Sequence, residues 1–138
     1  MGKITMTMTE EQLRLVNKAI EEYFRLRLGQ FWDFADDVCE QGIDLSSENP
    51  NHEKVFDNYL VRRNALKTSF ETLFRELTVN TGAKSQDCMD MIDMWETIRH
   101  WFWQQKTEDQ RKEWTVDSNP PLHEGQYPLP VIKKEVSE

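Results

Sequence analysis

The sequence has few of the residues that cross-link or interrupt a fold. It contains two cysteines, five glycines and five prolines in 138 residues, and four of the prolines lie among the last twenty. Two cysteines exclude a disulfide-rich scaffold. The scarcity of proline before the last twenty residues leaves most of the chain free to form long helices. No apolar run is long enough to span a bilayer, so we expect no membrane partner.

Basic residues are too few to balance the acids. The chain carries 17 Lys and Arg against 25 Asp and Glu, a net charge of −8. Residues 29–58 hold eight acids and one lysine. This balance argues against nucleic acid as a partner, because nucleic-acid binding needs a basic surface. The acidic segment is either a surface for a basic partner, such as a DNA mimic, or a solvated helix face with an acidic loop. We favour the solvated face.

The N-terminus lacks the continuous apolar segment of a signal peptide. We therefore expect Cys39 and Cys88 to be reduced, buried thiols in a cytoplasmic protein.

Residues 88–103 form the least polar helical stretch, with apolar side chains recurring every three or four residues. Such a helix needs partners on more than one side, so we predict that it is the central helix of an all-α, three- to four-helix bundle. An extended, proline-rich strap follows it. Thr9 and Gln12 form a capping-box pattern at the start of the first helix. At Gly29 the pattern allows either one kinked helix or two helices. The predicted helical stretches cover residues 10–28, 29–41, 52–79 and 85–105.

Composition changes at both ends of the chain. The first residues alternate apolar and polar side chains, which predicts a short strand or an extended arm. From Lys106 onward, prolines and scattered apolar residues predict a strap that lies on the bundle surface. The predicted segments are an N-terminal arm (1–9), a helical bundle domain (10–105), an extended strap (106–132) and a flexible tail (133–138).

Catalytic and metal-binding patterns are absent. No Ser or Cys has the surroundings of a nucleophile, the three histidines are far apart in sequence, and no phosphate-binding glycine loop occurs. We predict no catalytic residues, no metal site, no cofactor and no enzymatic activity. Asp90, Asp93 and Glu96 form an acidic ridge on the central helix, for which a solvated face is the better account.

Five tryptophans occur in the chain. Trp32, Trp103 and Trp114 are the three that could be exposed. An exposed tryptophan near an arginine is typical of a protein-binding hot spot. The alternative is that these rings hold the C-terminal strap against the bundle.

Four polar residues interrupt apolar stretches: Arg25, Gln30, Arg99 and His100. If the first helix packs on the central helix, they could converge into a pocket for an anion or phosphate. The alternative, which we favour, is that the arginines pair with acids on neighbouring helices and that His100 makes a local hydrogen bond.

Three short motifs carry a resemblance. They are YFRLRLGQF at residues 23–31, IRH at 98–100 with Trp103 after it, and the PPL and PLP segments at 120–122 and 128–130. With these motifs the chain resembles a group of small uncharacterised proteins of tailed bacteriophages and prophages. The resemblance covers most of the chain. It implies a phage accessory protein in the cytoplasm of a bacterial host, and it carries no function to transfer.

Two functional hypotheses follow. The first is a non-enzymatic protein that binds a host or phage protein and inhibits a host process such as defence. The second is a protein that binds or sequesters a nucleotide or another anion in an Arg/His pocket, with a homo-oligomer interface as one location. The candidate binding residues are Arg25, Gln30, Trp32, Asp33, Asp36, Asp37, Arg99, His100 and Trp103.

Overall fold

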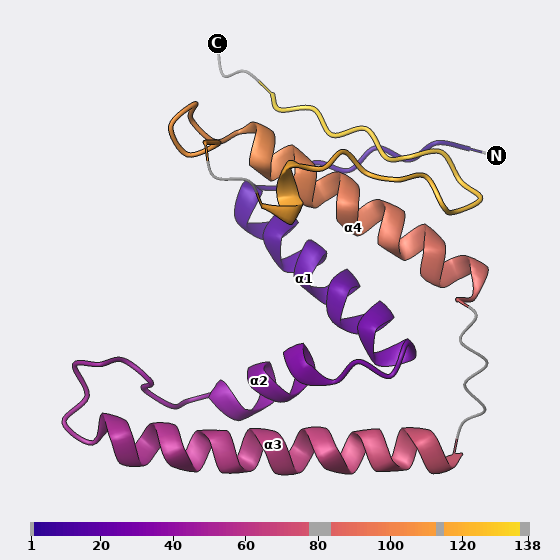
Figure 1. Cartoon of the computed structure of the whole chain (residues 1–138). Coiled ribbons are helices and arrows are strands. Elements are labelled where there is room, and N and C mark those ends of the chain that lie inside the picture. The colour runs from indigo at the N-terminus through magenta and orange to yellow at the C-terminus, as the bar shows by residue number, and fades with distance from the viewer. Residues whose placement is uncertain (1, 78–83, 113–114, 136–138) are drawn as a thin grey trace. The chain divides into compact units, whose positions relative to one another are not determined.

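A computed structural model describes residues 2–77, 84–112 and 115–135 (Figure 1). These residues contain four α-helices, one short 3-10 helix and no strand, so the all-α prediction is confirmed. Trp114, the predicted helix end near residues 78–82 and the tail residues 136–138 lie outside the described residues. The elements are α1 (Glu10–Arg27), α2 (Trp32–Glu40), α3 (His52–Leu77), α4 (Gln86–Gln104) and η1 (Val116–Ser118).

The chain divides into two compact units. One unit joins Met1–Phe24 to Lys84–Glu138, and the other is Arg25–Ala83. Each unit is described by itself below. The predicted segment limits, which place residues 10–105 in one bundle, stay a prediction.

The predicted capping box at the start of α1 is confirmed. The Thr9 N–H donates to Gln12 Oε1 over 2.9 Å, and the Gln12 N–H donates to Thr9 Oγ1 over 3.1 Å. Residues 2–9 form an exposed arm and not a strand. At the other end of α1, Gly29 adopts a φ of +76° and the helix stops. The sequence allowed either one kinked helix or two helices at this glycine, and the structure has two separate helices.

Replacing Gly29 by alanine is expected to lower the free energy of unfolding by about 2–4 kcal/mol, through a left-handed backbone and a steric clash. An added Cβ would lie 2.7 Å from Cε1 of Phe74. Gly42 is the matched control because its φ is +73° and nothing lies within 4 Å of an added Cβ. The Gly42→Ala variant should lose only about 1–2 kcal/mol in a urea titration. Equal losses in the two variants would show that the contact with Phe74 is unimportant.

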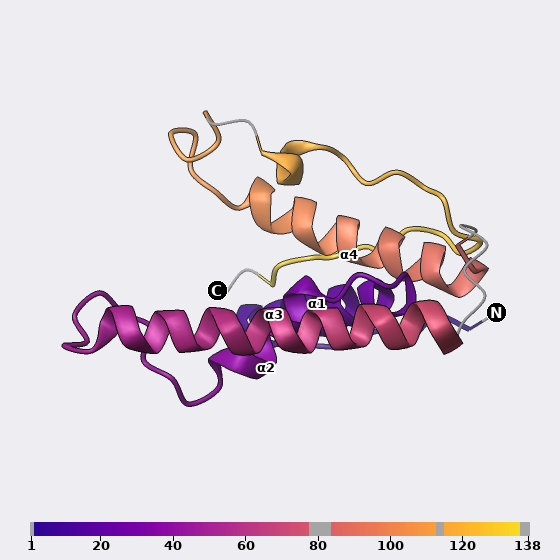
Figure 2. The ribbon, with the colours of Figure 1, turned by 60° about the horizontal axis from the view of Figure 1, so that its bottom comes forward.

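In the unit Arg25–Ala83, α2 lies alongside α3 (Figures 1 and 2). Phe31, Ala35 and Tyr59 are buried between the two helices, and the Phe31 ring stacks on Phe70 at 5.5 Å between centroids. The 26 residues of α3 extend about 39 Å, whereas the 9 residues of α2 extend about 14 Å. The apolar stripe of α3 is therefore longer than α2 can cover, and Leu77 is 77% exposed.

In the other unit, α4 contributes the buried core residues Cys88, Ile92 and Ile98. The Phe24 ring of α1 meets Trp95 edge-on at 5.4 Å. Cys88 is a buried free thiol, as predicted, whereas the free thiol of Cys39 in the second unit is only partly buried.

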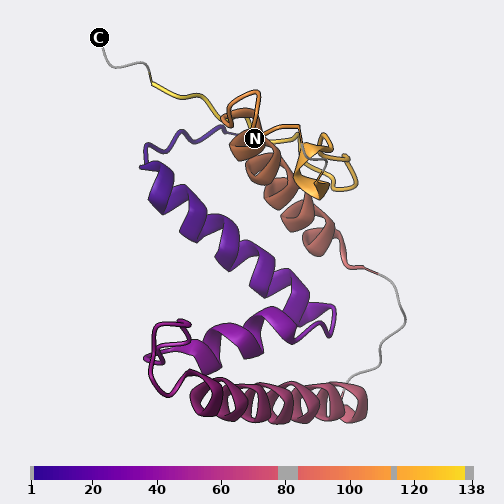
Figure 3. The ribbon, with the colours of Figure 1, turned by 60° about the vertical axis from the view of Figure 1, so that its left-hand side comes forward.

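Residues 115–135, hereafter the strap, run beside α4 without regular secondary structure except η1 (Figures 1 and 3). The prediction of an extended C-terminal strap is confirmed from residue 115 onward, whereas residues 106–112, which were predicted to belong to it, form turns. Near its end, Lys134 Nζ lies 2.6 Å from Glu10 Oε1, and this ammonium lowers the pKa of the Glu10 carboxyl. The strap therefore contacts both helices of its unit.

Candidate functional site

The four residues of the predicted anion pocket belong to two different units. Arg25 and Gln30 lie in the unit Arg25–Ala83, and Arg99 and His100 lie in the unit built around α4. They are therefore described as two pairs, each with its own partners.

The first pair closes the turn between α1 and α2. Arg25 Nη1 donates to Gln30 Oε1 over 2.8 Å, and Arg25 Nε lies 3.0 Å from Asp33 Oδ2. The Gln30 N–H also donates to the Arg25 carbonyl oxygen over 2.8 Å. Three of the predicted binding residues thus hold one another across a local turn, as the pairing alternative proposed.

Asp36 is also engaged within its unit. Its Oδ1 accepts a hydrogen bond from the Tyr59 hydroxyl over 2.7 Å and lies 3.4 Å from Arg63 Nη1. The third predicted acid, Asp37, is half-buried. Because Asp33 and Asp36 both face basic or hydroxyl partners of their own unit, they offer less free negative charge than the sequence indicates.

Tyr59 gives this cluster a measurable pH dependence. Burial, with the hydrogen bond to Asp36, raises the pKa of the Tyr59 phenol to about 12. Since the folded state disfavours the phenolate, the stability from this residue is intact below pH 10 and is lost as the pH rises from 10 to 12. A Tyr59→Phe variant should lack this part of the alkaline loss, roughly 2–3 kcal/mol. Phenolate absorbance should show one tyrosine ionising near pH 12 in the parent protein and none there in the variant.

Trp32 lies on the surface of the same unit, where two cations contact its ring. Arg63 Cζ lies 4.8 Å from the ring centroid and Lys67 Nζ lies 4.1 Å from it. The indole is nevertheless 48% exposed, so the predicted exposure of Trp32 is observed. The two cations have acidic neighbours, because Arg63 pairs with Asp36 and Lys67 pairs with Glu71 over 2.7 Å. We call Trp32, Arg63 and Lys67 the Trp32 patch.

The second pair of pocket residues lies under η1. The Arg99 guanidinium stacks over the Trp95 ring at 4.5 Å, and its Nε lies 3.6 Å from Asp117 Oδ1. His100 Nδ1 lies 3.1 Å from the Asp117 carbonyl oxygen, and its Nε2 lies 3.2 Å from the side-chain amide nitrogen of Gln104. Since that amide can only donate, we assign the proton of a neutral His100 to Nδ1, which donates to the carbonyl.

Trp103 stacks on His100, with 5.4 Å between ring centroids and 18° between the ring planes. It is half-buried rather than exposed, and its Nε1 is fully buried. Its position beside the residues that contact η1 agrees with the alternative in which tryptophans hold the strap.

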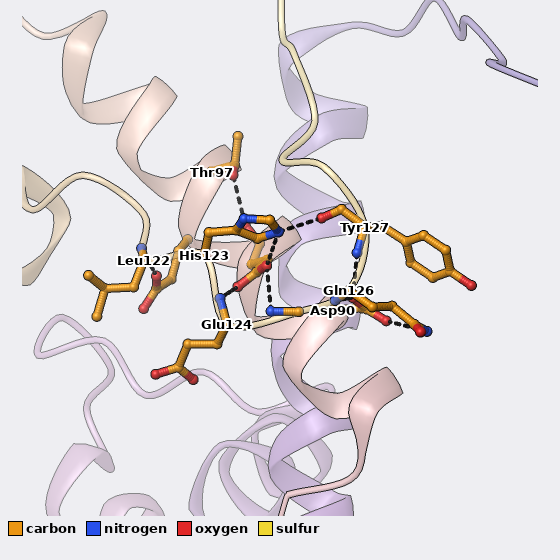
Figure 4. A network of polar contacts seen from close by, with 10 residues as sticks. Asp90, Thr97, Leu122, His123, Glu124, Gln126 and Tyr127 are labelled. Atoms are coloured by element: carbon orange, nitrogen blue, oxygen red, sulfur yellow. Dashed lines mark hydrogen bonds and ion pairs between the residues drawn. The ribbon is translucent and has the colours of Figure 1, made fainter. Parts of the chain in front are cut away.

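The ridge of Asp90, Asp93 and Glu96 is not a solvated face, and that prediction is wrong. Five backbone N–H groups of residues 122–127 donate to the three carboxylates (Figure 4). Asp93 accepts from Glu124 over 3.0 Å and from Gly125 over 2.9 Å, and it is only 3% exposed. We call these three carboxylates the carboxylate ladder. A buried carboxylate is stable when such hydrogen bonds replace its hydration.

The carboxylate ladder was also compared with the arrangement that a metal site needs. Within residues 2–77, 84–112 and 115–135, no group of three or more His, Cys, Asp or Glu side chains is placed to hold a metal ion. His123 lies near the ladder, with its Nε2 3.8 Å from Asp93 Oδ2 and 2.8 Å from the Tyr127 carbonyl oxygen. The carboxylate ladder accepts hydrogen bonds from backbone N–H groups and thereby holds the strap.

Among the described helices, none is both long and apolar enough to cross a bilayer.

Similarity to other proteins assigns no role to these residues. Comparison of the chain with protein-family models, with curated proteins and with solved structures finds no match.

Proposed function

We propose that this chain is a phage-type accessory protein that binds another protein, of phage or host origin, without catalysing a reaction. Binding would inhibit a host process such as defence. The observation that supports this proposal is the Trp32 patch, an exposed indole whose ring contacts an arginine and a lysine.

The composition of the patch is that of a binding hot spot. Tryptophan and arginine are the residues most enriched where single side chains carry much of a binding energy. The side chains of Arg63 and Lys67 are only 21% and 17% exposed, so they are already held in place. A partner that covers the indole therefore orders few further side chains, which lowers the entropic cost of binding.

The acidic surface predicted from Asp33, Asp36 and Asp37 is a weaker basis for the same function. Asp33 pairs with Arg25, and Asp36 pairs with Tyr59 and Arg63. Reversing these charges would break contacts within the unit, so a loss of binding could reflect a loss of folding. The Trp32 patch offers a cleaner test.

We expect Trp32→Ala to reduce capture of the partner at least tenfold, because a central tryptophan commonly contributes 2 kcal/mol or more to binding. The purified, tagged chain is the bait, lysate of phage-infected bacteria is the source, and quantitative mass spectrometry compares the captured proteins between variants. Melting temperatures of the baits show whether each is folded.

Leu77→Ala is the matched control. Leu77 is exposed on the same unit, ten residues beyond Lys67 along α3, about 15 Å away. This variant should capture the same protein in the parent amount. Undiminished capture by Trp32→Ala, or an equal loss in both variants, would contradict the assignment of the binding surface to the Trp32 patch.

Anion binding remains the second candidate function, favoured by one observation. The Arg99 side chain is only 10% exposed, and its Nε has no hydrogen-bond partner among the described residues. A buried arginine of this kind suits an oxyanion ligand.

A further inference from the structure

Three buried hydrogen-bonding atoms without partners belong to residues of α4 and to the residue that precedes η1. They are Arg99 Nε, Trp103 Nε1 and Thr115 Oγ1, and none has a hydrogen-bond partner among the described residues. Arg99 and Trp103 lie four residues apart on α4 and therefore share one face of the helix. Thr115 directly precedes η1, which packs on α4. Each buried group left unpaired costs roughly 1–3 kcal/mol, so the contact between η1 and α4 carries a penalty that a suitable ligand would relieve.

Asp117 of η1 places a negative charge next to Arg99, but the distance between the two groups is long for a hydrogen bond. Its Oδ1 is 3.6 Å from Arg99 Nε, whereas charge-assisted N–H···O bonds are about 2.7–2.9 Å long. Its carbonyl oxygen accepts the His100 Nδ1–H. The Trp103 indole N–H has no acceptor within the part of the chain that the structure describes. One carboxylate therefore neutralises the arginine without satisfying the neighbouring donors.

A second cation lies at the edge of the same group. Arg111 Cζ is 5.7 Å from the Trp103 ring centroid, and the side chain is exposed. Its Nε donates to the Lys106 carbonyl oxygen over 2.9 Å, which holds the guanidinium near Trp103. Arg111 thus lies beside the Trp103 indole, and Arg99 lies one helical turn before Trp103 on α4. Together the two guanidinium groups can neutralise a doubly charged anion.

We propose that Arg99, His100 and Trp103 form a binding site for the phosphate group of a free phosphate or a phosphate monoester, and that Asp117 occupies this site as an internal competitor. A phosphate offers more acceptor oxygens than a carboxylate and can reach several donors from different directions. Because Asp117 of η1 contacts both Arg99 and His100, the ligand enters by displacing η1 from α4. The carboxylate ladder holds the strap further along α4, so the rest of the strap stays attached. This site rests on the second candidate function, anion binding at Arg99, and is independent of the Trp32 patch.

Isothermal titration calorimetry with inorganic phosphate and with AMP tests this site in the full chain, at constant ionic strength. Asp117→Asn removes the competing charge but keeps the carbonyl contact to His100. This variant should bind phosphate at least tenfold more tightly than the parent chain. In the Asp117→Asn background, Arg99→Gln should abolish binding and Trp103→Phe, which removes only the N–H and part of the ring, should weaken it at least threefold.

Each outcome bears on the proposal. Binding by Asp117→Asn that is no tighter than in the parent chain, or that persists unchanged in Trp103→Phe, overturns the site. The Trp103→Phe result decides the matter even if Arg99→Gln fails to fold, which circular dichroism would show. Equal affinities for phosphate and AMP identify free phosphate as sufficient, whereas tighter AMP binding identifies a phosphate monoester whose organic part also contacts the chain.

Discussion

Replacement of Asp93 by alanine is expected to lower the free energy of unfolding by about 3–5 kcal/mol, because the variant loses two hydrogen bonds to a buried carboxylate. The backbone N–H groups of Glu124 and Gly125 donate to this carboxylate, and both bonds are partly buried. Alanine has no acceptor for them, and Asp93 is only 3% exposed, so both N–H groups lose their partner at a buried position. Since a domain of this size is stable by only about 5–15 kcal/mol, the loss is severe.

Urea titration followed by circular dichroism measures this loss, and hydrogen exchange locates it. Exchange should accelerate first in residues 122–127, which the ladder holds, and only later in α4. Asp57→Ala is the matched control because Asp57 is exposed on α3, and it should change stability by less than about 0.5 kcal/mol. Slow exchange of residues 122–127 in Asp93→Ala would contradict a holding role for Asp93.

Gly125→Ala is expected to lower the free energy of unfolding by about 2–4 kcal/mol, from overpacking and from the hydrogen bonds that the displaced strap gives up. An added Cβ would lie 2.9 Å from both Asp90 Cα and Asp93 Oδ2, and it would overlap Asp90 Oδ1. The Cα atom belongs to the backbone of α4, so a side-chain rotation cannot relieve the clash. Gly125 does not have a positive φ, and the penalty is therefore steric rather than conformational.

The measurement is again a urea titration, with limited proteolysis to detect release of the strap. Gly2→Ala is the matched control, because no atom lies within 4 Å of an added Cβ at that position. It should leave both the unfolding midpoint and the cleavage pattern unchanged. A Gly125→Ala chain as stable as the parent would show that the strap can move away from α4 at little cost.

The helices could be predicted from the sequence because their signals are local. The Thr9 and Gln12 side chains cap a helix that begins at the next residue, and Gly29 and Gly42 mark two backbone positions with positive φ. Each of these features depends on neighbours within a few residues. The strap could be predicted because its signal is also local. Its prolines exclude a helix whatever the strap packs against.

The carboxylate ladder could not be predicted because its partners have no sequence signature. Every non-proline residue carries a backbone N–H, so nothing in residues 122–127 identifies them as donors to Asp90, Asp93 and Glu96. The available signal was indirect: acids three residues apart in an otherwise apolar helix, and a lone glycine between the two proline segments. Acidic residues on a helix are more often exposed to solvent, and the prediction of a solvated face was wrong for these three carboxylates.

The predicted binding residues show a similar division. Arg25, Gln30 and Asp33 satisfy one another across a turn, which their close spacing allowed as an alternative. The contact of Trp32 with Arg63 and Lys67 joins α2 to α3 across a loop, and a helical pattern does not give the rotation of one helix against another. The sequence could therefore identify Trp32 as a candidate binding residue. Its contacts with Arg63 and Lys67 became known only from the packing of α2 on α3.

The long sequence separation of the ladder bonds has a consequence for rates. These bonds join residues 26 to 37 positions apart, whereas the bonds within α4 join residues four apart. Closing so long a loop costs chain entropy before any bond forms, so we expect the helices to form first and the strap to dock after the transition state for folding. Weakening the ladder should then leave the refolding rate unchanged and accelerate unfolding. The lifetime of the folded unit, rather than the speed at which it forms, would depend on six residues near the end of the chain.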